Sequence, residues 1–251
     1  MKALITGGSG GIGLEVAKIL AAKGYELTLV ARSKEKLEKV VKELPGSGHQ
    51  FVVADLSQKK EVDSLKEIID ANSYDVFINN AGVGMYGRFT EMPISEQVKM
   101  INLNVIALTV LSYLYLNQAK KGDALVNLSS TLGTSSFPGL ASYSATKAYV
   151  INFSESLWGE YKKRGVYVMG FCPGVTHTDF HSNASGSDDG YPKFIIQTST
   201  AVAMELVSSL ERRSGPNVVS GFMNRLMLGF QRLLSRKMVV NMMGSFSPVK
   251  F

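Results

Sequence analysis

Short apolar runs alternate with longer amphipathic stretches along most of this 251-residue chain. Several of the apolar runs are almost unbroken, which is typical of parallel strands covered by helices on both faces. We predict strands at Lys2–Thr6, Glu26–Ala31, Gln50–Ala54, Val76–Asn79, Ala124–Leu128 and Tyr167–Phe171, and a short seventh strand near Asn217–Ser220. The stretches between them repeat apolar positions at helical spacing, and we predict helices at Gly11–Lys23, Ser33–Leu44, Lys59–Ala71, Ser95–Lys120 and Ser142–Arg164.

This alternation predicts an α/β fold, with a single doubly wound parallel sheet and helices on both faces. The length suits one domain spanning residues 1–251, because no repeat or linker divides the chain. The pattern breaks at about residues 176–196, where small and polar residues are concentrated. We predict a loop there and interpret it as a lid over a substrate.

Positive charge is concentrated at the C-terminal end of the chain. The sequence carries 27 lysines and arginines and 21 acidic residues, a formal net charge of +6. Segment 220–251 contains five of these cations and no acidic residue, which leaves only +1 for the other residues. A nearly neutral body lacks the broad basic surface of nucleic-acid-binding proteins, so we expect no nucleic-acid partner.

The basic segment 220–251 is also amphipathic. Its apolar residues recur at helical spacing, at Phe222, Leu226, Phe230, Leu233 and Leu234. Three interpretations remain open: the segment covers a substrate pocket, packs against a second subunit, or lies on an anionic membrane. We favour packing or pocket covering over peripheral membrane contact.

The chain has one cysteine, Cys172, so an intrachain disulfide is excluded. We find no signal peptide and no run of the ~20 apolar residues that a membrane-spanning helix needs. These observations lead us to expect a cytoplasmic protein.

A glycine-rich turn follows the first predicted strand and opens the first predicted helix. It has the sequence TGGSGGIG at residues 6–13. Glycines let backbone N–H groups approach a pyrophosphate closely, and the helix N-terminus adds positive potential. We predict that a dinucleotide phosphate binds at Gly7, Ser9, Gly10, Gly11, Ile12 and Gly13.

The end of the second predicted strand indicates which dinucleotide binds. Folds that bind NAD usually place an acidic residue there, on the ribose 2′-hydroxyl. This chain has Arg32 and Ser33 instead. An arginine can pair with a 2′-phosphate through two N–H groups, and a serine can donate a further hydrogen bond. We therefore predict NADP(H) in preference to NAD(H); the alternative is a solvated arginine at a helix start.

Tyr143 and Lys147 are candidates for acid–base chemistry. Their spacing of four places them on one face of the predicted helix, one turn apart. A free tyrosine titrates near ~10, and a neighbouring ammonium lowers that pKa. Such a tyrosine can exchange a proton with a substrate oxygen while hydride moves to or from the cofactor. Taken alone, the pair is also consistent with an aromatic ring packed under a lysine stem.

Together with the glycine turn, this pair makes the sequence resemble the short-chain dehydrogenase/reductase family over roughly residues 1–178. Residues 79–82 match its Asn-Asn-Ala-Gly motif, and residues 173–178 match its Pro-Gly-x-x-x-Thr segment. The resemblance implies a Rossmann-type sheet. It also implies several groups of cofactor contacts. Asp55 and Leu56 would contact the adenine, and Pro173, Gly174, Val175 and Thr178 the nicotinamide. Asn80, Ala81 and Gly82 would border the cofactor, and Tyr143 and Lys147 would contact it as well.

The resemblance implies two further catalytic residues. Ser130 lies thirteen residues before Tyr143, at the interval usual for the serine that hydrogen-bonds the substrate oxygen. Asn104 matches the asparagine that holds a proton-relay water. Asn102 offers a second asparagine on the same helix, and we choose Asn104 because the residues after it fit the motif better. Ala107 departs from the glycine that many members carry there.

These features predict an NADP(H)-dependent oxidoreductase that interconverts a small-molecule carbonyl and a secondary alcohol. Tyr143 serves as general acid or base, Lys147 lowers its pKa, Ser130 polarises the substrate oxygen and Asn104 anchors the relay. The alternative is a non-catalytic dinucleotide-binding scaffold or redox sensor, which has no need of all four residues. By resemblance we expect a homodimer or homotetramer paired through helices 95–120 and 142–164. His177 and His181 have zinc-binding spacing, but their place in the loop leads us to expect no metal.

Overall fold

The computed structural model describes residues 1–177, 195–247 and 249, and it contains a seven-stranded sheet whose strands all run parallel. The strand order is β3-β2-β1-β4-β5-β6-β9, so the predicted doubly wound sheet is confirmed. The strand bounds lie within one residue of the prediction: β1 Lys2–Thr6, β2 Glu26–Ala31, β3 Gln50–Val53, β4 Val76–Asn79, β5 Ala124–Leu128, β6 Tyr167–Cys172 and β9 Asn217–Val219.

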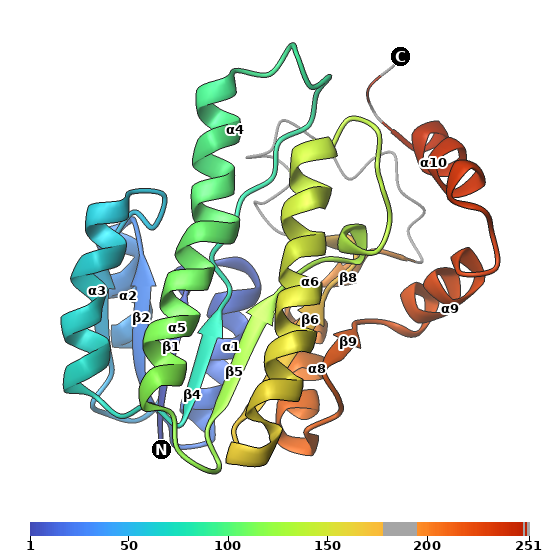
Figure 1. Ribbon diagram of the computed structural model, residues 1–251. Helices are drawn as coiled ribbons and strands as arrows, with labels where there is room; N and C mark the ends of the chain where they lie inside the picture. The colour runs from blue at the N-terminus through green and yellow to red at the C-terminus, as the bar shows by residue number, and fades with distance from the viewer. Residues whose placement is uncertain (178–194, 248, 250–251) are drawn as a thin grey trace.

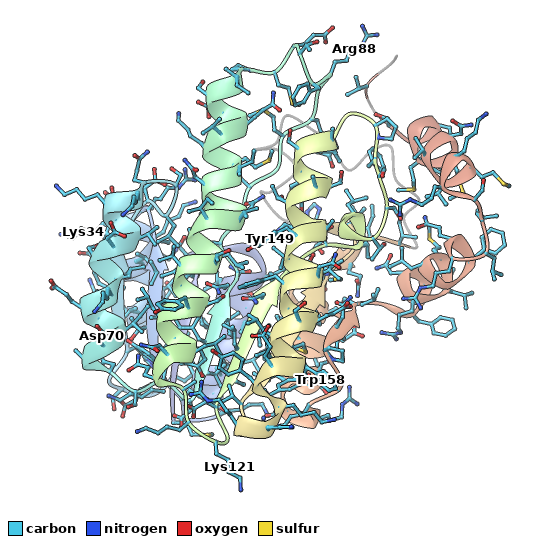
Figure 2. The ribbon with its side chains drawn as sticks, viewed as in Figure 1. Lys34, Asp70, Arg88, Lys121, Tyr149 and Trp158 are labelled. Atoms are coloured by element: carbon cyan, nitrogen blue, oxygen red, sulfur yellow. The ribbon has the colours of Figure 1, made fainter. Side chains whose placement is uncertain are left out.

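Helices cover both faces of the sheet (Figure 1). One face carries α1 Gly11–Ala22, α2 Lys34–Glu43 and α8 Ser199–Arg212, and the other carries α3 Lys59–Ala71, α5 Leu108–Gln118 and α6 Ala141–Tyr161. Alternate strand residues enter the two cores, because successive side chains of a strand point to opposite faces. Ile5 packs in the first core and Leu4 in the second. Charged side chains such as Lys34 and Asp70 point into solvent instead (Figure 2).

Helix α8 was absent from the sequence-based prediction. Its apolar residues Val202, Leu206 and Leu210 recur every four residues and are buried against α1. Thr198 caps its N-terminus by accepting a hydrogen bond from the Ala201 amide at 3.2 Å. The periodic signal is therefore present in the sequence, next to the serines and threonines at the start of the helix.

The long helix predicted at 95–120 consists of three parts. Helix α4 (Ile94–Ile101) runs through a π-helical turn at Asn102–Ala107 into α5. Contrary to our expectation, the run Ile94–Gln118 is long and apolar enough to cross a membrane by length and composition alone. A buried helix of a globular core passes the same test, and 44% of its most apolar stretch is buried here. Similarly, α6 ends at Tyr161 and a 3-10 turn, Lys162–Arg164, completes the predicted helix.

The chain after α6 builds one rim of the molecule. Strands β7 (Thr176–His177) and β8 (Gln197–Thr198) pair with each other at the two ends of the predicted lid. The rest of that lid, with Thr178 and His181, lies outside the described residues. The C-terminal segment forms α9 (Phe222–Gln231) and α10 (Arg236–Ser245), which stand beside the sheet at the right of Figure 1.

Candidate active site

The predicted site residues that the structure describes lie near the carboxyl ends of the parallel strands. Because every strand of the sheet runs in the same direction, these ends meet at one edge. Each loop that leaves this edge contributes to the site: Gly7 after β1, Arg32 after β2, Asp55 after β3, Asn80 after β4, Ser130 after β5 and Pro173 after β6.

The glycine turn needs glycine at several of its positions. Gly7 and Gly11 adopt φ of 68° and 55°, a left-handed conformation that other residues rarely adopt. A Cβ on Gly13 would overlap the Gly7 carbonyl and the Asn80 amide, whereas a Cβ on Gly10 would meet nothing. Helix α1 begins at Gly11 with no side-chain cap and no acidic residue in its first turn. The turn thus leaves backbone and space free for a phosphate.

A threonine that we did not single out as a site residue holds this turn to the next loop. The Thr6 hydroxyl accepts hydrogen bonds from the backbone amides of Asn80 and Ala81, both at 3.0 Å. The Asn80 side chain donates to the carbonyls of Thr6 and Gly7 at 2.8 and 3.1 Å. These bonds cross the point where the strand order reverses, which is where doubly wound sheets bind ligands.

The residues after β2 and β3 differ in how far they are already engaged. Arg32 is exposed, and within the described residues it forms no ion pair. The Ser33 hydroxyl caps α2 by accepting from the Lys36 amide at 3.3 Å, and it donates to Glu35 at 3.1 Å. Asp55 accepts from both the amide and the hydroxyl of Ser57 through one carboxylate oxygen. The Ser33 hydroxyl is therefore engaged at the start of α2, while Arg32 forms no ion pair within the described residues.

Asn104 lies in the π turn and its side chain is 1% exposed. Its Oδ1 accepts from the Val83 amide at 3.0 Å, and its Nδ2 donates to the Val83 carbonyl at 2.9 Å and to the Thr146 hydroxyl at 3.2 Å. Asn104 therefore joins the loop after β4 to α6. Asn102 is only partly buried and makes none of these contacts. Single π turns recur at functional sites in helices.

Lys147 is buried in the centre of the site. Its Nζ donates a hydrogen bond to the Leu128 carbonyl at 2.9 Å. Burial lowers the pKa of this ammonium to about 8, and the nearby Cys172 thiol opposes the shift. A Cβ on Gly82 would lie 3.2 Å from the Asn104 Oδ1 and 3.3 Å from the Lys147 Nζ. Gly82 therefore leaves room where the two side chains converge.

Tyr143 lies one turn before Lys147 on α6 and is buried. The Lys147 Nζ is 5.8 Å from the centre of its ring. The surrounding cluster is apolar and includes Met100, Phe137, Leu140 and, from α10, Met243. This cluster brings a phenol and an ammonium together in a site that excludes much of the solvent.

Ser130 caps the short 3-10 turn Thr131–Gly133, where its hydroxyl accepts from the Leu132 amide at 3.1 Å. The neighbouring Ser129 hydroxyl donates to the Lys147 carbonyl at 2.7 Å. The loop after β5 is therefore attached directly to α6. A hydroxyl, a phenol and an ammonium from two consecutive elements are suited to exchange a proton with a substrate oxygen.

The chain after β6 meets a residue that the sequence did not reveal. Asn224 of α9 is buried, and its Nδ2 donates to the Ser220 carbonyl at 2.8 Å and to Gln197 at 3.3 Å. A Cβ on Gly174 would overlap this side-chain amide. The glycine at position 174 is therefore required by α9, and the C-terminal segment closes one side of the predicted nicotinamide region.

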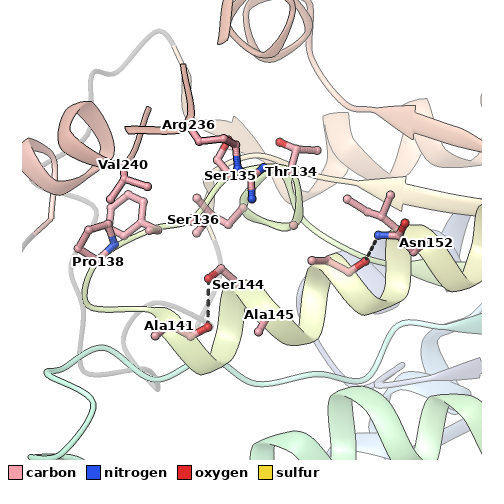
Figure 3. Close-up of a pocket in the computed structure, with 15 residues that line it drawn as sticks. Thr134, Ser135, Ser136, Pro138, Ala141, Ser144, Ala145, Asn152, Arg236 and Val240 are labelled. Atoms are coloured by element: carbon pink, nitrogen blue, oxygen red, sulfur yellow. Dashed lines mark hydrogen bonds between the residues drawn. The ribbon is translucent and has the colours of Figure 1, made fainter. Parts of the chain in front are cut away.

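A hollow of about 630 Å³ lies between α6, the loop after Ser130 and α10 (Figure 3). Ser144, Ala145 and Asn152 line it from α6, and Arg236 lines it from α10. Neither Tyr143 nor Lys147 lines it, but Phe137 does, and Phe137 also belongs to the apolar cluster that contains Tyr143. The hollow therefore adjoins the candidate active site.

Among the described residues, no group of three or more histidines, cysteines or acidic residues is placed to hold a metal ion. The predicted pairing of His177 with His181 lies partly outside the described residues. The Cys172 thiol is buried and donates to Asn217 at 3.1 Å. Burial raises its pKa to about 12, so it is not a reactive thiolate.

The chain is similar to known proteins in sequence. The sequence profile of a family described as short chain dehydrogenase matches residues 1–188. A very-long-chain 3-oxoacyl-CoA reductase from Anas platyrhynchos is 34% identical over 182 residues, which cover 68% of this chain and 58% of that protein. A diacetyl reductase of the (S)-acetoin forming kind from Staphylococcus epidermidis is 32% identical over 185 residues, covering 70% of this chain and 72% of that protein.

The fold of this chain is similar to that of solved structures over almost the whole length of the chain. A short-chain dehydrogenase from Sphingobium yanoikuyae in complex with NADPH superposes with a TM-score of 0.82 at 26% identity, covering 92% of this chain and 94% of that one. A solved structure that gives insight into 7beta-hydroxysteroid dehydrogenase stereoselectivity superposes with a TM-score of 0.85 at 25% identity, covering 96% of both chains.

Proposed function

Because this chain belongs to the short-chain dehydrogenase/reductase family, we propose that it interconverts a carbonyl compound and a secondary alcohol with NADP(H) as cofactor. The observation that carries this proposal is the convergence of Lys147 and Asn104 beside Gly82, with the Tyr143 ring centre 5.8 Å from the Lys147 Nζ. Three polar groups buried at the carboxyl edge of the sheet are costly to fold unless they serve a purpose there. Proton transfer to and from a substrate oxygen is such a purpose.

Each residue has a separate role in this proposal. Tyr143 donates a proton to the substrate oxygen during reduction and accepts one during oxidation. Lys147, while protonated, favours the phenolate form of Tyr143 by electrostatic attraction. Ser130 donates a hydrogen bond to the substrate oxygen. Asn104 holds the loop at Val83 against α6, and through that contact keeps the proton path in register with Tyr143.

The glycine turn fits a dinucleotide, because Gly10 leaves open space beside the uncapped N-terminus of α1. When bound there, the reduced cofactor supplies the hydride. We propose that the turn holds the pyrophosphate and that Arg32 pairs with a 2′-phosphate, since its side chain is exposed and has no other anionic partner in the described residues. Structural neighbours in complex with NADPH or NADP support this assignment.

Tyr143 belongs to an apolar cluster. Met100, Phe137 and Leu140 are its other buried members, and Met243 packs against it. Such a lining favours a carbonyl compound with an apolar body, because a polar one would lose hydrogen bonds to water on entering. The chain spans only part of the length of the very-long-chain 3-oxoacyl-CoA reductase that it resembles, so the choice of substrate rests on this lining.

A panel of ketones and aldehydes tests the proposed function, with oxidation of NADPH followed by its absorbance. We expect turnover that favours apolar carbonyl compounds and requires Tyr143. The alternative function is a dinucleotide-binding scaffold or sensor, and it would be supported if NADPH bound tightly while the whole panel remained unreduced. The buried thiol of Cys172 gives a thiol-based sensor no support.

We also propose that subunits pair through the outer surface of α4, α5 and α6. Large apolar side chains are exposed there at Ile94, Val98, Ile106, Tyr113 and Tyr149. Analytical ultracentrifugation should detect a dimer or tetramer, and Tyr113→Glu should shift it towards monomer. A monomeric wild-type protein would contradict this proposal.

A further inference from the structure

Helix α9 turns its apolar face towards solvent. Its exposed apolar residues lie one helical turn apart or beside each other, and with Leu233 just after the helix they form a stripe of Phe222, Met223, Leu226, Met227, Phe230 and Leu233. Phe222 is 66% exposed, Leu226 is 55% exposed and Phe230 is 58% exposed. The opposite side of the helix carries Asn224, which is buried over Gly174. The inner face of α9 therefore belongs to the site, and the outer face has no cover within the described chain.

The charges that segment 220–251 itself carries all have one sign. Arg225 is paired with Glu205 at 2.6 Å. Arg232, Arg236 and Lys237 are exposed and form no ion pair in the described part of the chain. The sequence places no acidic residue anywhere in 220–251. Apart from Glu205 of α8, whose charge Arg225 neutralises, the described charged residues beside the exposed stripe are therefore cations.

Two of these cations lie where they oppose helix formation. Arg236 and Lys237 occupy the first turn of α10, next to its Ser235 cap. The N-terminus of a helix carries positive potential, so cations there destabilise the helix. Exposed phenylalanines and leucines likewise contribute nothing to the stability of the isolated protein. The combination indicates a surface that is used in binding.

Charge complementarity selects the occupant of this surface. A second copy of the chain would bring a segment with the same net charge of +5 against it and no acidic residue to pair with. An anionic lipid bilayer offers negative headgroups to the cations and acyl chains to the apolar stripe. We propose that α9 and α10 bind the surface of membranes that contain anionic lipids. This inference goes beyond the proposed catalytic function and does not depend on it.

The hollow beside α10 supplies a polar edge to the same surface. Arg236 and Val240 line it from α10, opposite the hydroxyls of Thr134, Ser135 and Ser136 (Figure 3). The hydroxyls of Thr134 and Ser135 already donate to the Thr131 carbonyl and to Gln231. The Arg236 guanidinium and the Ser136 hydroxyl remain as groups that can donate to phosphate oxygens. A lipid phosphate can therefore lie at this edge while the stripe on α9 contacts the acyl chains.

Vesicle flotation tests the proposal directly. The full-length protein is mixed with vesicles of phosphatidylcholine alone or of phosphatidylcholine with phosphatidylglycerol, at low and high salt. We expect the protein to float with the phosphatidylglycerol vesicles only, and added salt should weaken the binding. Absence of binding to phosphatidylglycerol vesicles at low salt would overturn the proposal.

Two sets of variants test the contributions of the cations and of the apolar stripe to vesicle binding separately. The double variant Arg232→Gln, Lys237→Gln should weaken vesicle binding about 25-fold, because each lost cation should weaken it about fivefold. Phe222→Ser, Leu226→Ser and Phe230→Ser together should abolish it. All five side chains are exposed, so circular dichroism should report an unchanged fold.

Matched controls change the same chemistry elsewhere on the surface. Lys60→Gln with Lys121→Gln removes two exposed cations from the body, and Val53→Ser, Phe89→Ser and Met204→Ser remove three exposed apolar side chains. Both controls should bind vesicles like the wild type. Controls that weaken vesicle binding as much as the α9–α10 variants would refute the proposed membrane-binding surface. So would a protein that does not bind vesicles and whose self-association is abolished by the stripe variants.

Discussion

The Nζ atom of Lys147 donates a hydrogen bond to the carbonyl oxygen of Leu128 at 2.9 Å, at a point where the lysine side chain is almost completely buried. One carbonyl is a small compensation for an ammonium that has lost its water. The pKa of Lys147 is accordingly lowered to about 8. The loop end of β5 therefore holds, beside Tyr143, a cation that gives up its proton more readily than an ordinary lysine.

This burial predicts a dependence of stability on pH. Folded Lys147 releases its proton near pH 8, and a lysine in the unfolded chain does so near 10.5. Between these values the unfolded chain binds more protons, so the free energy of unfolding rises with pH, by about 3 kcal/mol at most. The contribution is complete above the unfolded pKa and is lost as the pH falls through 8.

Urea unfolding at about pH 7 and about pH 10 measures this effect in the cofactor-free protein. Lys147→Met removes the titrating group and serves as the reference. The stability of the wild type relative to Lys147→Met should increase at the higher pH. An equal difference at both pH values would contradict the low pKa.

Arg32 should determine which cofactor is preferred. Arg32→Ala should lower kcat/KM with NADPH by about 10- to 100-fold, because a charge-assisted contact to a phosphate is lost. The value with NADH should hardly change. Lys39→Ala, on the neighbouring helix α2, is the matched control and should leave both cofactors unaffected. Equal losses with NADPH and NADH would assign Arg32 a general role in folding or orientation.

The two asparagines of the π turn should behave differently. Asn104→Ala removes the partners of the Val83 amide and carbonyl, at about 1–3 kcal/mol for each buried group left unpaired. The loop would shift against α6, and we expect kcat to fall by roughly 100-fold. Asn102→Ala should have little effect on either quantity. Steady-state kinetics and thermal unfolding of the two variants decide whether Asn104 was correctly chosen.

The contact between Gly174 and Asn224 should be visible as an energetic coupling. Gly174→Ala places a Cβ on the Asn224 amide and should destabilise the protein by about 1–3 kcal/mol. In an Asn224→Ala background the same change should cost much less, because the space is then free. Denaturant unfolding of the four proteins of this cycle measures the coupling. Additive costs would show that α9 does not press on residue 174 in solution.

Local signals in the sequence were sufficient for most of the sheet and for the glycine turn. The apolar runs gave each strand to within one residue, and the positions of Gly7 and Gly13 reflect a turn that only glycine can form. Helix α8 was missed although Val202, Leu206 and Leu210 carry its period. Polar residues stand between these positions, and the helix became clear only from its packing on α1.

Other features depend on contacts between distant parts of the chain. The π turn at Asn102–Ala107 is stabilised where Asn104 reaches Val83, which no local propensity indicates. Asn224 lies fifty residues from Gly174, and nothing near either residue predicts their contact. The sequence predicts a hydrogen bond from Ser33 to the cofactor, but it does not reveal that this hydroxyl also caps α2 and donates to the exposed Glu35 in the structure. Each of these features is decided by tertiary packing.

Turnover by the Tyr143→Phe variant tests whether the phenol of Tyr143 transfers the proton. We expect kcat with NADPH and an accepted carbonyl substrate to fall by at least about 100-fold, because the proton donor is lost. NADPH binding by fluorescence titration should be nearly unchanged. Tyr149→Phe, on the same helix, removes a hydroxyl that contacts only Thr109 among the described residues, and should retain wild-type turnover. A Tyr143→Phe variant with wild-type kcat would contradict the account.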